Sequence, residues 1–111
     1  MQSVEEINRS LSGYTDVVEL MLSSSTPPDW KASLKLVLRA NRAANRAVET
    51  LTVIFEGVSS LQLRDFGNLS QIMLLKVEDV RRDQLDQIKF LVTDLENQRI
   101  AFACGSIRFP Q

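Results

Sequence analysis

The chain has 111 residues, of which 44% are hydrophobic and 24% are charged, a composition typical of one globular domain rather than of a disordered or fibrous segment. The 13 lysine and arginine residues nearly balance the 14 aspartate and glutamate residues, and the net charge of −1 argues against a surface built to grip nucleic acid or anionic lipid. The lack of histidine excludes imidazole bases and imidazole metal ligands, and the single cysteine, Cys104, excludes an intramolecular disulfide.

The first predicted element is a helix over residues 3–22. Ser3 and Glu6 stand three residues apart, which is the spacing of a capping box and predicts that a helix begins there. Apolar residues then recur three and four positions apart, as they do along one face of a helix. These residues are Val4, Ile7, Leu11, Tyr14, Val18 and Met21. Gly13 is a weak point that such a helix tolerates.

A second and longer helix is predicted over residues 27–57. The segment 26–29, Thr-Pro-Pro-Asp, is a start signal, because proline is tolerated in the first turn and a carboxylate interacts favourably with the positive helix end. Asn41 on this helix either pairs with its symmetry mate or faces the edge of a bundle. Residues spaced four and three apart form the predicted seam of a homodimer: Trp30, Leu34, Val37, Asn41, Ala44, Val48, Leu51 and Phe55.

The third predicted helix covers residues 69–104, and a tail over residues 105–111 follows it. Asn68 and Gln71 repeat the capping spacing, and apolar residues continue at helical intervals behind them. Residues 78–87 are almost wholly polar, so the region is either one helix with a solvated middle or two helices. The lack of glycine and proline favours one helix. The apolar residues of the preceding linker, residues 59–67, either cap the bundle or anchor a partner.

Together these elements predict an all-α fold, a small elongated bundle with three main helices in a single domain. A helix of 30 residues is about 45 Å long, whereas a compact domain of 100 residues has a radius of gyration of about 13 Å. Apolar residues outside the seam, among them Leu36, Leu38 and Leu74, leave more apolar surface than three helices cover. Homodimerisation is therefore predicted to complete the bundle.

No cluster of residues predicts catalysis, a metal site, a cofactor or a small-molecule substrate, so the chain is predicted not to be an enzyme. An acidic cluster on the third helix alternates with Arg81 and Arg82, which favours ion pairs over a magnesium site. The cluster consists of Glu78, Asp79, Asp83 and Asp86. Cys104 is expected to be a small buried hydrophobe.

A stripe of basic residues follows the second predicted helix: Lys31, Lys35, Arg39, Arg42 and Arg46. Such a stripe is either a solvated helix face or a surface that meets an acidic patch on a protein, and nucleic acid is disfavoured because no aromatic residues interleave it. The N-terminal residues lack a secretory signal, and the longest apolar runs are far shorter than the roughly 20 residues of a membrane span. A cytoplasmic location without membrane contact is therefore predicted.

The order of elements resembles the quorum-sensing anti-activators of the TraM and QslA type. The resemblance rests on the capped first helix, the turn at residues 27–29, the long helix with basic Arg39 and Arg42, and the long last helix. It implies a small helical dimer that binds a LuxR-type transcription factor and blocks its binding to DNA. The alternatives are a type III or flagellar secretion chaperone and a structural coiled-coil subunit. The predicted partner-binding residues are Leu36, Leu38, Arg39, Arg42, Arg46, Phe66, Met73 and Leu74.

Overall fold

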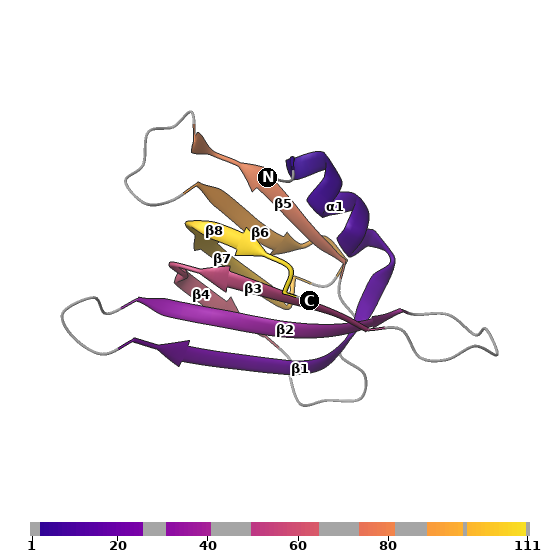
Figure 1. The fold of residues 1–111 in the computed structure, drawn as a ribbon, viewed down its shortest axis with the longest axis horizontal. Helices are drawn as coiled ribbons and strands as arrows, with labels where there is room; N and C mark the ends of the chain where they lie inside the picture. Colours follow the sequence, from indigo (N-terminus) through magenta and orange to yellow (C-terminus); the bar gives the residue numbers. More distant parts are fainter. Residues whose placement is uncertain are drawn as a thin grey trace.

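A computed structural model gives the chain a mostly β fold (Figure 1). The structure describes residues 3–25, 31–40, 50–64, 74–81, 89–96 and 98–110. Within these ranges one short helix, α1 (Val4–Ser12), precedes eight strands that form two four-stranded antiparallel sheets. The prediction of an all-α bundle with three main helices is therefore wrong.

The two sheets divide the strands between them. The first sheet has the order β1-β2-β3-β8, with β1 (Tyr14–Ser24), β2 (Ala32–Ala40), β3 (Thr50–Glu56) and β8 (Ser106–Arg108). The second sheet has the order β4-β7-β6-β5, with β4 (Ser59–Leu63), β7 (Ile100–Cys104), β6 (Phe90–Asp94) and β5 (Leu75–Asp79). Strand β4 occupies part of the predicted linker, and β8 lies in the predicted tail.

The predicted helix over residues 3–22 is correct only in its first half. The Ser3 backbone N–H donates to Glu6 Oε1 at 3.0 Å, and the Glu6 N–H donates to Ser3 Oγ at 3.2 Å, so the capping box is confirmed. The helix ends at Ser12, and Gly13 is its C-cap. The chain then turns into β1 at Tyr14 instead of continuing as a helix.

Strand β2 shows why the predicted helix over residues 27–57 is wrong. Leu34, Leu36 and Leu38 are fully buried, and the residues between them lie on the opposite face of the sheet. This alternation has the period of two that defines a strand with one buried face. The leucines that appear surplus on a helix are therefore the core positions of a strand.

The predicted helix over residues 69–104 is replaced in the same way. Its described residues include β5, β6 and β7; buried residues alternate with more exposed ones in β5 and β6, and in β7 Ala103 is buried in addition. Val77, Val92 and Phe102 are examples from the three strands. The described residues of this region therefore contain neither one long helix nor two helices.

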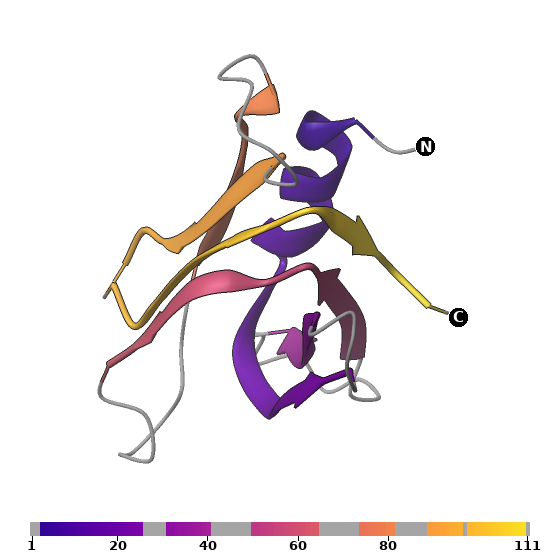
Figure 2. The same ribbon diagram turned by 90° about the vertical axis from the view of Figure 1, so that its left-hand side faces the viewer.

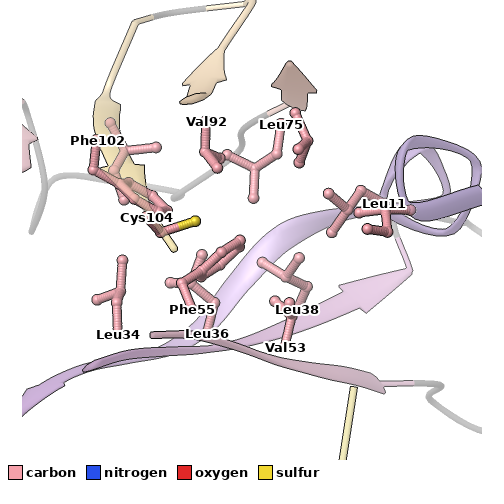
Figure 3. Close-up of a cluster of buried hydrophobic side chains, with 13 residues drawn as sticks. Leu11, Leu34, Leu36, Leu38, Val53, Phe55, Leu75, Val92, Phe102 and Cys104 are labelled. Carbon is pink, nitrogen blue, oxygen red and sulfur yellow. The ribbon is translucent and has the colours of Figure 1, made fainter. Parts of the chain in front are cut away.

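The core lies between the two sheets, and α1 closes one end of it. Figure 3 shows side chains of β2 and β3 pointing toward those of the second sheet, with Leu11 of α1 beside them. The rings of Phe55 and Phe102 meet edge to face with their centroids 4.8 Å apart. Burying a side chain such as Leu11 stabilises the fold by roughly 1.5–3 kcal/mol, so these contacts hold the sheets together.

One antiparallel ribbon joins the two sheets. Strands β3 and β4 run on from one another, as do β7 and β8, so both pairs pass from one sheet to the other at the same corner (Figure 2). Gly57 at this corner has a φ of +69°, a conformation that favours glycine. The Gly105 N–H donates to the Glu56 carbonyl oxygen at 2.8 Å, which fixes the two bends side by side.

Helix α1 also covers an open sheet edge. Strand β5 is at the end of the second sheet, where backbone groups lack a neighbouring strand. The Asn8 side-chain amide donates to the Val77 carbonyl oxygen at 2.9 Å, and the Val77 N–H donates to Asn8 Oδ1 at 2.7 Å. The Asn8 amide thus replaces one residue of a missing strand and ties the helix to the sheet.

Candidate functional site

The described residues of the predicted partner surface do not form one surface. Leu36 and Leu38 are 0% and 1% exposed, so they are core residues and are not available to a partner. Arg39 is exposed on β2 and pairs with Asp16 at 3.3 Å, and Leu74 is half-buried just before β5. Four of the predicted contact residues lie outside the described residues: Arg42, Arg46, Phe66 and Met73.

The predicted homodimer seam is split between the two faces of the first sheet. Leu34 and Phe55 lie in the core, Leu51 packs against it, and Val37 is half-buried on the outer face. The argument for dimerisation relied on surplus apolar residues that the structure buries within one chain, so the homodimer stays a prediction without that support. The other seam residues lie outside the described residues: Trp30, Asn41, Ala44 and Val48.

Strand β1 carries a group of exposed apolar side chains. It is an edge strand that pairs only with β2, and Val18, Met21 and Leu22 are 54%, 50% and 53% exposed. Charged residues, proline and bulges commonly protect natural edge strands; β1 carries Asp16, Glu19 and two bulges, but neither lysine nor proline occurs between Tyr14 and Ser24. Exposed apolar side chains on an edge strand are typical of a surface that contacts another protein.

The basic stripe predicted from the sequence is largely neutralised where it is described. Lys35 pairs with Glu19 at 3.1 Å, and Arg39 pairs with Asp16, so acids of β1 offset the cations of β2. Exposed pairs of this kind contribute little to stability, but they remove local net charge. Of the described stripe residues, only Lys31 forms no ion pair with another described residue.

A cleft lies at the corner where β8 leaves β7, and we call it the corner cleft. It has two adjoining parts of about 550 and 530 Å³, and Lys89, Gly105 and Ser106 line both. Lys31 also lines the first part. The second part runs between the first turn of α1 and β8, and Arg81 contributes to its wall.

The corner cleft carries an excess of positive charge. Four of its lining residues are cations, namely Lys31, Arg81, Lys89 and Arg108, whereas two are acids, Glu6 and Glu56. The Arg108 guanidinium lies 3.5 Å from the Glu56 carboxylate, and Arg81 pairs with Asp79 outside the cleft lining. Lys31 and Lys89 form no ion pair with any other described residue.

The described residues hold no group of three or more histidine, cysteine, aspartate or glutamate side chains arranged to bind a metal ion. In the acidic cluster, Asp79 pairs with Arg81, and Asp83 and Asp86 lie outside the described ranges. Cys104 is buried as expected, and burial raises the pKa of its thiol to about 12. A thiol with this pKa stays protonated at neutral pH and is a poor nucleophile. In the part of the chain that the structure describes, no helix is long and apolar enough to cross a membrane.

Sequence reasoning missed that Lys89 and Arg108 line the same cleft as Lys31. No local motif marks them, because the corner cleft gathers residues from separate segments of the chain. Gly105, placed between two short runs of strand-forming residues, is the one local signal of a bend at which such a cleft forms.

The fold and these surfaces define a small β-rich domain with an exposed apolar edge strand and a basic cleft. A protein-family model described as "Immunity protein PIM8" matches residues 1–109, so the chain belongs to this family. A search of curated proteins found no match, and a search of solved structures found none. Membership in an immunity protein family confirms the prediction of a protein partner at this general level.

The family match corrects the predicted identity of the chain. The resemblance to quorum-sensing anti-activators is wrong, and so is the LuxR-type transcription factor that it implied as a partner. The alternatives, a secretion chaperone and a coiled-coil subunit, are also wrong. All of them depended on long helices, and the described residues of the two segments predicted to be long helices form strands instead.

Proposed function

We propose that this chain neutralises a cognate toxin by binding to it, without catalysing a reaction. The observation that carries the proposal is the match of the immunity protein family to residues 1–109. The chemistry of the chain agrees with it, because the sequence contains no histidine and its one cysteine is buried with a pKa of about 12. The cytoplasmic location stays a prediction.

Neutralisation by binding needs apolar side chains that a partner can cover, and the described surface offers some. A stable interface between proteins buries about 1,600 Å² in total and centres on apolar side chains that lose water. The exposed side chains of Val18, Met21 and Leu22 supply such groups. Since the net charge is only −1, long-range attraction by net charge contributes little, and any salt dependence of binding arises from local charges.

A growth experiment tests protection. A protein that protects its own producer has to be made together with the toxin, so the candidate toxins are proteins that the same organism produces. Each candidate is expressed in a bacterial host with and without the chain. We expect growth to stop with the toxin alone and to recover when the chain is present. A candidate set in which the chain restores growth against no toxin contradicts the proposal.

A titration tests whether protection is stoichiometric. Purified toxin is mixed with increasing amounts of the chain, and the remaining toxin activity is measured at once and after an hour. If the chain acts by binding, the remaining toxin activity falls linearly to zero near one equivalent of the chain and does not change with time. Toxin that is separated under denaturing conditions and refolded then regains its activity and has an unchanged mass. Inactivation by far less than one equivalent, growing with time, would instead identify an enzyme.

A further inference from the structure

We propose that the corner cleft receives an acidic segment of the toxin, whose carboxylate side chains pair with Lys31 and Lys89. This inference rests on the proposed function and names the chemistry of the partner segment. It starts from the charge of the cleft: Arg108 pairs with Glu56 and Arg81 with Asp79, which leaves Lys31 and Lys89 against one further acid of the lining, Glu6, on a chain whose net charge is −1. The positive charge is therefore local to the cleft and not a property of the whole surface.

The two lysines set the charge that a partner must bring. Lys31 and Lys89 are exposed in the free chain, and neither forms an ion pair with another described residue. A partner that covers the cleft removes water from both ammonium groups, which costs free energy unless opposite charges replace the water. Carboxylates on the partner offset this cost, whereas an apolar or basic segment does not.

The two arginines of the cleft are already held in place. The Glu56 carboxylate contacts Arg108 at 3.5 Å and accepts a hydrogen bond from Ser106 Oγ at 3.2 Å. Arg81 donates through two of its nitrogens to Asp79, and its guanidinium lies 5.9 Å from the centre of the Phe90 ring. A guanidinium has five N–H donors, so further donors are left for a carboxylate, and little freedom is lost on binding.

The shape of the cleft suits a short segment of chain rather than a single ion. Its two parts measure about 550 and 530 Å³, within the range of roughly 300–1,000 Å³ for sites that enclose drug-sized ligands. Phe90, Ile107 and Phe109 give the second part an apolar lining that packs against the carbon stems of acidic side chains. The second part follows β8, whose outer side is the free edge of the first sheet.

Charge-reversal variants test the inference with a matched control. Lys31→Glu and Lys89→Glu change the charge inside the cleft, and Lys76→Glu makes the same change at an exposed lysine of β5 that does not line the cleft. Binding to the cognate toxin is measured by calorimetry at low and high salt, and circular dichroism checks that each variant folds. We expect each cleft variant to raise Kd by about tenfold or more and Lys76→Glu to change it by less than about twofold.

The outcomes separate this inference from the proposed function. If the wild-type chain binds and protects, but both cleft variants bind as tightly as the Lys76→Glu control, the inference fails and the proposed function stands. If the wild-type chain neither binds nor protects, both fail. If the cleft lysines instead bind a single-stranded oligonucleotide more tightly than they bind the toxin, the cleft takes phosphates and the inference is wrong. Rescue of Lys89→Glu by an acid-to-lysine change in the toxin would identify the pairing residue.

Discussion

Replacing Asp94 is expected to destabilise the fold more than any change at an exposed acid. Asp94 is 2% exposed at the end of β6. Its Oδ1 accepts hydrogen bonds from the backbone N–H groups of Leu74 and Glu96, and its Oδ2 accepts one from the N–H of Arg99, each at 3.0 Å. One side chain therefore ties the residue before β5 to the hairpin between β6 and β7.

The hydrogen bonds give the size of the effect. Asp94→Ala leaves three backbone donors without this acceptor, and each buried donor left unsatisfied costs about 1–3 kcal/mol. We expect a loss of about 3–6 kcal/mol, because water reaches some of the freed groups. Asp94→Asn keeps one acceptor oxygen but places an NH₂ group against a backbone donor, so a loss of about 2–3 kcal/mol is expected. A small domain has a total stability of only about 5–15 kcal/mol.

Urea unfolding followed by far-ultraviolet circular dichroism measures these losses. The control is Glu78→Ala, which removes an exposed acid of β5 that forms no ion pair with another described residue. The control is expected to change the free energy of unfolding by less than about 0.5 kcal/mol. The reasoning is refuted if Asp94→Ala is as stable as this control, since the three hydrogen bonds would then contribute nothing.

Two further predictions concern the corner between the sheets and the buried thiol. Gly57→Ala should lower the free energy of unfolding by about 1–2 kcal/mol, because alanine is strained at a φ of +69°. The control Gly13→Ala should be tolerated, because Gly13 has an ordinary backbone conformation and a Cβ added there meets no atom within 4 Å. Equal melting temperatures for the two variants would contradict this. Burial raises the pKa of Cys104 from 9.0 to about 12, so the unfolded chain loses the thiol proton at a lower pH than the folded chain. The contribution of the protonated thiol to the free energy of unfolding is complete below pH 9. It is lost as the pH rises toward 12, by up to about 4 kcal/mol. Unfolding curves of Cys104→Ala should lack this part of the pH dependence.

The sequence predicts the first turn of α1 correctly because its cause is local. Two side chains three residues apart complete the capping box, and nothing distant is needed. The end of the helix is missed because the apolar residues of β1 have nearly the spacing of one face of a helix. Bulges after Tyr14 and Val17 insert extra residues, so the residues of β1 that pack against the core, Tyr14, Val17 and Leu20, are spaced three apart instead of two.

The alternation in β2 is visible in the sequence but admits two interpretations. Leu34 and Leu38 stand four apart and fit a helix face, and they equally fit every second position of a strand. Leu36 between them decides the matter, because a strand buries all three leucines on one face whereas a helix turns Leu36 away. The apolar residues left over by the helical interpretation were therefore the sign that its period was wrong.

The corner cleft is beyond sequence reasoning for a different reason. Lys31 and Lys89 are brought together only by the pairing of strands from both sheets, and no window of sequence contains that pairing. The helical interpretation placed Lys31 in a stripe with Lys35 and Arg39, but acids of β1 neutralise Lys35 and Arg39 in the structure, and only the paired strands show this.

The bends that join the sheets also form the cleft. We expect stability and toxin binding to depend mainly on different residues of this corner. Because β8 leaves β7 at Gly105 and pairs with β3, no strand of the described residues pairs with its outer edge, and the second part of the cleft lies along β8. Gly57 serves the geometry of the bend, whereas Lys89 only presents charge beside it. Gly57 also lines the cleft but brings no charge to it. Gly57→Ala should therefore lower the melting temperature and weaken toxin binding less than Lys89→Glu does, whereas Lys89→Glu should leave the melting temperature unchanged. The melting temperature and the toxin affinity are measured for both variants. A parallel loss of both quantities in each variant would contradict the expectation and show that the cleft and the bend act as one unit.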